Sequence, residues 1–95
     1  MKILVIEIDL RAPFVHSLKE KRMILRSITA KLQNKFNISI REVKNQDVHQ
    51  IISIGIAKLD LNIKDSDKSK EKIIDFIEEN CQAEIVHIDS EIINY

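Results

Sequence analysis

Apolar residues recur along this chain with two different periods, and the order of these periods limits the folds open to it. Residues 2–11 begin apolar throughout and then alternate, which is typical of a strand with one buried face. In all, six segments follow one another in the order strand, helix, strand, strand, helix, strand: residues 2–11, 17–37, 38–44, 48–61, 65–81 and 83–93. The order predicts an α+β fold, a ferredoxin-like βαββαβ sandwich whose four-stranded antiparallel sheet carries two helices on one face.

The length of 95 residues predicts a single domain that covers residues 1–95. Hydrophobic residues make up 44% of the chain and charged residues 32%, which favours a folded domain over a disordered one. The single Cys81 cannot form an internal disulfide, and no apolar run is long enough to span a bilayer. We therefore expect a cytoplasmic protein without a membrane segment.

Charge is distributed unevenly between the two halves of the chain. Residues 1–50 contain ten Lys and Arg against five Asp and Glu, and residues 51–95 contain five against ten. The halves therefore carry net charges of +5 and −5. This asymmetry favours either an anionic partner on one side of the molecule or complementary self-association.

A capping box marks the start of the first predicted helix. Ser17 is followed three residues later by Glu20, so that the serine can accept a helix N–H while the glutamate reaches back. His16 stands just before the cap. Its ring either packs as part of a hydrophobic staple or contacts an anion held at the helix N-terminus.

The same helix carries a basic stripe opposite its apolar face. Lys19, Arg22 and Arg26 fall on this stripe, which either contacts phosphates or is simply a solvated face. Lys21 falls on the apolar side, where a lysine must extend its ammonium to solvent or find a partner. The candidate nucleic-acid or anion site consists of His16, Ser17, Lys19, Lys21, Arg22 and Arg26.

The segment His16–Arg22, with the sequence HSLKEKR, is the most specific part of a resemblance that covers nearly the whole chain. Weaker matches follow at Phe36–Ser39, Glu42-Val43, Gln46-Asp47, Gln50 and Gly55-Ile56. These residues resemble the YlxP-like family of bacterial proteins, named for a domain of unknown function. The resemblance implies a ferredoxin-like fold, a cytoplasmic location and frequent genomic proximity to translation initiation factor two and ribosome-binding factor A. It implies no established activity.

The uncovered face of the predicted sheet is a candidate homodimer interface. Its small strip predicts close approach by a partner, and apolar residues surround this strip. The residues expected in this interface are Val5, Ile51, Ser53, Gly55, Ala57 and Ile85, with Leu59 at its margin. Glu7, Asp9, His87 and Asp89 are expected on the same face, but the sequence gives them no ligand geometry.

No constellation in the sequence identifies a reaction, and the chain lacks a Gly-rich phosphate loop, a Cys-x-x-Cys motif and an aromatic RNA-binding motif. We expect no cofactor and no metal. The leading hypothesis is a non-catalytic module that binds ribosomal RNA or a ribosomal subunit through its first helix. The alternatives are a homodimeric interaction module without a nucleic-acid role and, with less support, a small anion-binding hydrolase centred on His16 and Lys21.

Overall fold

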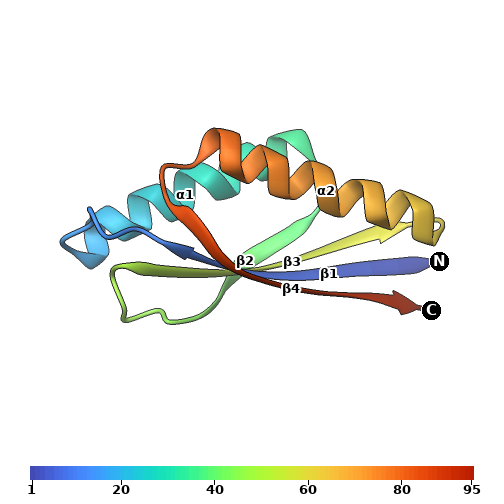
Figure 1. Cartoon of the computed structure of the whole chain (residues 1–95), viewed down its shortest axis with the longest axis horizontal. Coiled ribbons are helices and arrows are strands. Elements are labelled where there is room, and N and C mark those ends of the chain that lie inside the picture. Colours follow the sequence, from blue (N-terminus) through green and yellow to red (C-terminus); the bar gives the residue numbers. More distant parts are fainter.

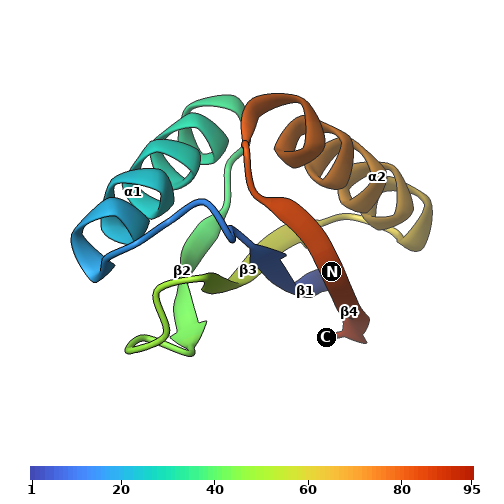
Figure 2. The same ribbon diagram turned by 60° about the vertical axis from the view of Figure 1, so that its left-hand side comes forward.

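The computed structural model describes residues 1–95 as six elements in the predicted order (Figure 1). They are β1 (Lys2–Arg11), α1 (Leu18–Lys35), β2 (Ser39–Lys44), β3 (Ile51–Asp60), α2 (Ile63–Asn80) and β4 (Glu84–Asn94). The strands form one antiparallel sheet in the order β2-β3-β1-β4. Figure 2 shows both helices on the same face of this sheet. The predicted ferredoxin-like α+β fold is confirmed.

The core lies between the sheet and the two helices. Its fully buried aliphatic side chains alternate along the central strands and recur with helical spacing on α1 and α2: Leu4, Ile6, Ile8, Leu10, Ile52, Ile54, Ile56, Ile28, Leu32, Ile73 and Ile77. Antiparallel pairing places Ile6 opposite Ile56 and Ile8 opposite Ile54. Because successive strand residues point to opposite faces, the odd-numbered residues of β1 are left on the open face.

The start of α1 agrees with the capping prediction. Ser17 has an extended backbone, and its Oγ accepts a hydrogen bond from the Glu20 N–H at 3.1 Å. The return bond from the Ser17 N–H to the Glu20 carboxylate is absent, so the structure contains one half of the predicted box. The serine alone fixes the first turn of the helix.

The start of α2 differs from the sequence prediction. The helix begins at Ile63 rather than at Asp65-Ser66-Asp67, because Asn62 is the N-cap and its Oδ1 accepts from the Asp65 N–H at 2.9 Å. Asn caps a helix about as well as Asp does, and this choice leaves Asp65 in the first turn, where a carboxylate is favourable. Neither helix is long and apolar enough to cross a membrane.

The last strand also differs from the prediction at its beginning. Asp9 pairs with His87 but Leu10 pairs with Ile85, so that Val86 is an extra residue in a β-bulge. Ile85 therefore packs against the core, and its expected place on the open face is wrong. Val86, which strict alternation with the inward Ile88 would turn toward the core, is instead exposed. The bulge reverses the two positions because one added residue shifts the side-chain alternation.

The helix caps provide a direct test of the local structure. We expect Ser17→Ala to lower the free energy of unfolding by about 1 kcal/mol, because the Glu20 N–H loses its acceptor. Urea denaturation followed by circular dichroism measures the change. Ser27→Ala, at an exposed position within the same helix, is the control and should have little effect or stabilise slightly. Equal effects of the two substitutions would mean that Ser17 does not cap α1.

Candidate functional site

The basic stripe of α1 is exposed along its length. Lys19, Arg22 and Arg26 all point to solvent, and none of the ion pairs in the structure involves them. Met23 lies among them and is 62% exposed. These three cations therefore have no partner within the chain that would have to be displaced by an anionic ligand.

The two helices differ in charge. On α1, the exposed basic residues are Lys19, Arg22, Arg26, Lys31 and Lys35, and Glu20 is the one acidic residue. On α2, four lysines stand among six acidic residues. The helix layer thus has a positive side and a mildly negative side, which localises the positive charge of the first half of the chain on α1.

Lys21 does not belong to this exposed surface. Its side chain is 1% exposed, and Nζ donates to the carbonyl oxygens of Asn45 at 2.6 Å and Val48 at 2.8 Å. Glu42 Oε2 lies 2.8 Å from the same nitrogen as an ion-pair partner, without the alignment of a hydrogen bond. The expectation that Lys21 needs a partner is confirmed, but its placement in the anion site is wrong. Its ammonium has no face left for a ligand.

Burial of Lys21 also removes one of the functional alternatives. The hydrolase hypothesis required His16 and Lys21 to act together. His16 is exposed just before α1, whereas the Lys21 ammonium lies inside against the segment that joins β2 to β3. The two groups therefore do not form a common acid-base site. Of the predicted site residues at this helix end, His16, Ser17 and Lys19 remain together near the surface.

The loop between β2 and β3, which contacts Lys21, forms several further hydrogen bonds. Asn45 has a left-handed backbone with φ 59°, a conformation that asparagine tolerates well, and its Nδ2 donates to Ser53 Oγ at 2.8 Å. Gln50 Nε2 donates to the carbonyl oxygens of Pro13 and Val15. Residues 48–50 therefore belong to this loop, and β3 begins at Ile51 rather than at Val48 as predicted.

The small strip on the open face is already filled by the chain itself. A Cβ added to Gly55 would lie 2.7 Å from Val43 Cγ1, and Ser53 is fully buried beneath Asn45. Val43 is the extra residue of a bulge in β2, between Glu42 and Lys44. The expectation that Gly55 admits a partner is therefore wrong, because Val43 of the same chain takes that space.

The acidic residues of the open face are neighbours across strands. Glu7 pairs with Asp89 and Asp9 with His87, as the sequence predicts for a shared face. Lys44 Nζ lies 3.3 Å from Glu7 and 3.9 Å from Asp9. No three of these acidic and histidine side chains converge in a way that could hold a metal ion. On this surface, Glu7 and Asp9 thus share the ammonium group of Lys44.

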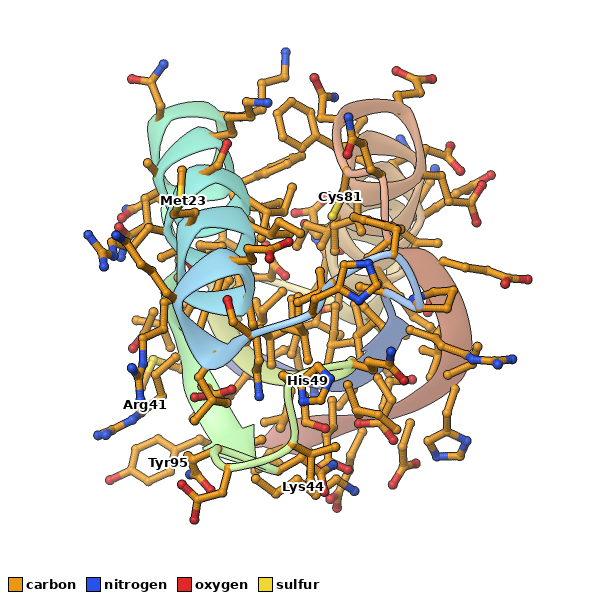
Figure 3. All side chains as sticks on the ribbon, turned by 90° about the vertical axis from the view of Figure 1, so that its left-hand side faces the viewer. Met23, Arg41, Lys44, His49, Cys81 and Tyr95 are labelled. Carbon is orange, nitrogen blue, oxygen red and sulfur yellow. The ribbon has the colours of Figure 1, made fainter.

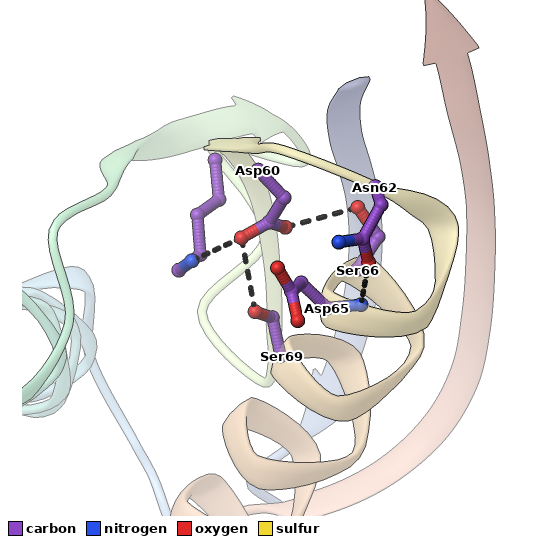
Figure 4. A network of polar contacts seen from close by, with 6 residues as sticks. Asp60, Asn62, Asp65, Ser66 and Ser69 are labelled. Carbon is purple, nitrogen blue, oxygen red and sulfur yellow. Dashed lines mark hydrogen bonds and ion pairs between the residues drawn. The ribbon is translucent and has the colours of Figure 1, made fainter. Parts of the chain in front are cut away.

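Asp60 forms the other buried polar network (Figure 4). Lys58 Nζ and the hydroxyls of Ser66 and Ser69 donate to its two oxygens. Burial alone would raise the pKa of Asp60, but these hydrogen bonds, first that from Lys58, together with the Lys58 charge, hold it below the ordinary value of 3.8. Ser66 is fully buried, so this network joins the end of β3 to α2.

A pocket of about 250 Å³ lies between α1 and the end of α2. Figure 3 shows Met23 on α1 and Cys81 at the end of α2, both of which line this pocket. Lys31 Nζ closes part of its rim by donating to the Asn80 carbonyl oxygen at 3.4 Å. The pocket contains no pair of groups arranged for acid-base or nucleophilic chemistry, so the exposed stripe of α1 remains the best candidate site.

Glu42 is the structurally important residue that the sequence interpretation missed. It follows Ile38 and Ile40 at the next inward position of β2, so its carboxylate is turned toward the helices. An inward carboxylate on this strand and an inward lysine on the adjacent helix are the signal that could have paired Glu42 with Lys21.

Comparison with known proteins relates the chain to a family, to a bacterial protein and to a solved structure. A family model described as "Protein of unknown function (DUF503)" matches residues 3–90. The uncharacterized protein YlxP of Bacillus subtilis (strain 168) is 42% identical over 62 residues, which are 65% of this chain and 67% of YlxP. Among solved structures, the de novo designed protein Foldit4 matches 100% of this chain and 99% of its own, with a TM-score of 0.54 at 12% identity. The designed protein supports the fold alone.

The contacts of Lys21 predict a large effect on stability. We expect Lys21→Met to lower the free energy of unfolding by about 3 kcal/mol, because two carbonyl groups lose their donor and Glu42 loses its counter-charge. Lys19→Met, on the exposed stripe, should change it by less than about 0.5 kcal/mol. Urea denaturation of both variants gives the comparison. A loss below about 1 kcal/mol for Lys21→Met would contradict the buried contacts.

The lowered pKa of Asp60 predicts a specific acid sensitivity. A carboxylate with a folded pKa below its unfolded value contributes stability that is present above the unfolded pKa, about 3.9, and is lost as the pH falls through the folded pKa. We expect Asp60→Asn to reduce the fall in urea-midpoint concentration between about pH 4.5 and pH 2.5. Asp67→Asn, at an exposed position of α2, should keep the wild-type slope. A wild-type slope in Asp60→Asn would refute the assignment.

Proposed function

The chain belongs to the DUF503 family of proteins of unknown function, and from this premise we propose that it is a non-catalytic module that binds the phosphate backbone of RNA through α1. The observation that carries the proposal is the exposed and unpaired state of Lys19, Arg22 and Arg26. Lys31 and Lys35 continue the positive charge toward the end of the helix.

The spacing of these residues suits a backbone ligand. At about 1.5 Å per residue, Lys19, Arg22 and Arg26 are separated along the helix axis by about 4.5 and 6 Å. Their long side chains can each reach a different phosphate. Arg binds phosphate through two parallel N–H groups, so Arg22 and Arg26 supply the more directional contacts and Lys19 supplies a point charge near the helix start.

The composition favours binding by charge rather than by sequence. The chain has three Phe, one Tyr and no Trp, and Phe36 and Phe76 stack edge-to-face against each other at the ends of the helices. Base stacking on aromatic side chains therefore contributes little. The ligand that best fits the α1 surface is a folded RNA recognised through its backbone, and the resemblance to a family encoded near translation factors favours ribosomal RNA.

A charge-reversal experiment tests the proposal. We expect the triple variant Lys19→Glu, Arg22→Glu and Arg26→Glu to lose binding to ribosomal RNA in a filter-binding assay, because all three contacts become repulsive. The matched control reverses Lys64, Lys68 and Lys72, which are exposed on α2. It changes the net charge by the same amount and should retain most of the binding.

The salt dependence gives a second measure from the same assay. Three phosphate contacts predict that the logarithm of the association constant falls against the logarithm of salt concentration with a slope of about −2 to −3. Each single reversal on α1 should reduce that slope by about 0.7 to 0.9. Equal loss in both triple variants would mean that net charge alone attracts RNA, and wild-type binding by the α1 triple would exclude this surface.

A further inference from the structure

We infer that the open face of the sheet is a homodimer interface in which β2 of one copy lies over β4 of the other. Both helices cover the opposite face (Figure 2), so outside the strip that Val43 and Asn45 fill, neither helix covers this surface. The inference does not rest on the RNA-binding proposal, because α1 and the open face lie on opposite sides of the sheet.

Cross-strand pairing arranges the open face in rows, and the central row has opposite charges at its two ends. Arg41 of β2 pairs with Gly55, Gly55 with Glu7, and Glu7 with Asp89 of β4. Arg41 and Asp89 are both exposed and take part in no ion pair. Three strand spacings of about 4.8 Å place them about 14 Å apart, too far to pair within one chain.

Each of the two neighbouring rows has one charged end of the same sign as the central row. On one side, Lys44 stands at the β2 end of the row of Ser53, Asp9 and His87. On the other side, the row that begins at Ser39 ends in Glu91 on β4. Lys44 is already held by Glu7 and Asp9 of its own chain. In these three rows, the charges at the ends that take part in no ion pair are thus Arg41 on β2 and Asp89 and Glu91 on β4.

This polarity selects one symmetric arrangement. A twofold axis parallel to the strands reverses the strand order in the second copy, so that β2 of one copy lies over β4 of the other. Each cross-strand row then lies over the same row of the second copy, which runs in the opposite direction. Arg41 then faces Asp89 of the partner subunit, twice in each dimer. An axis in the same plane but perpendicular to the strands would place β2 over β2 and β4 over β4, with like charges in contact.

The same arrangement brings apolar side chains together. Val5 pairs with Ala57 in the row that ends in Glu91, and Ile3 pairs with Leu59 in the row beyond it. The twofold axis therefore places Val5 over Ala57 of the second copy and Ile3 over its Leu59. Leu59 is 63% exposed in the single chain. Covering it and its neighbours removes apolar surface from water.

The size of the face suits a weak to moderate dimer. The four strands contain 37 residues. At about 3.3 Å per residue and about 4.8 Å between strands, they give a face of roughly 600 Å² on each partner. A standard stable interface buries about 800 Å² on each partner. We therefore expect association in the micromolar range, with aligned sheets as in a β-sandwich.

The test uses two complementary single reversals. Sedimentation velocity at low ionic strength, where exposed charges are least screened, should show a wild-type dimer at about 200 μM. Arg41→Glu and Asp89→Arg should each raise the dissociation constant at least about tenfold, because each homodimer then contains two repulsive contacts. Mixed in equal amounts, the two variants should form a heterodimer, because the introduced glutamate faces the introduced arginine at one contact and the native Arg41 and Asp89 face each other at the second.

Controls separate this result from general charge effects and from RNA binding. Lys64→Glu on α2 makes the same charge change as Arg41→Glu and should leave the dimer intact. Arg26→Glu should also leave it intact while weakening RNA binding, so the two proposals can fail independently. A monomeric wild type at about 200 μM, or a mixture of the two variants that stays monomeric while both keep their circular dichroism spectra, would overturn the inferred interface.

Discussion

The buried ammonium group of Lys21 connects the first helix to the hairpin of β2 and β3. It donates to two carbonyl oxygens of the intervening loop and forms an ion pair with the carboxylate of Glu42, so these contacts hold α1 in place over that end of the sheet. Because an unpaired charge in the interior is strongly unfavourable, the helix, the loop and the β2 bulge must form together. The exposed face of α1 is oriented by this inner contact, since the opposite side of the same helix turns toward solvent.

The basic residues of α1 therefore divide into two kinds, although they alternate within a few positions of the sequence. Lys21 is buried and pairs with groups in the interior, while Lys19 and Arg22, its near neighbours on either side, have no partner in the chain. A second division of charge runs across the open face, where β2 is basic and β4 acidic. A helix surface suited to a polyanion and a sheet surface suited to a second copy thus occupy opposite sides of one small domain, and each surface can be occupied without blocking the other.

Periodicity predicts most of this fold because the periods reflect burial directly. The alternation of residues 2–11 and the helical spacing after Ser17 place the core correctly, and the position of Lys21 on the apolar side already indicates that it needs a partner.

The errors arise where one residue changes the pattern. The bulges at Val43 and Val86 exchange the two faces over a short stretch, so the surroundings expected for Ile85 and Gly55 are wrong. Asn62 caps α2, but Asp65, Ser66 and Asp67 are equally good capping residues, and the local sequence does not show which of them starts the helix. Two of the partners of Lys21 are backbone carbonyl groups of a loop, and since every residue has a carbonyl group, no sequence pattern identifies them.

One experiment can measure, lysine by lysine, which ammonium groups are buried and which are covered by RNA. The protein is acetylated under limiting reagent with and without ribosomal RNA, and modification at each lysine is quantified by mass spectrometry. We expect Lys21 to stay unreactive in both states, Lys19 to react in the free protein and to be protected by RNA, and Lys64 to react equally in both. Rapid modification of Lys21 in the folded protein would show that its ammonium group is not buried, and equal reactivity of Lys19 with and without RNA would show that α1 is not the RNA-binding surface.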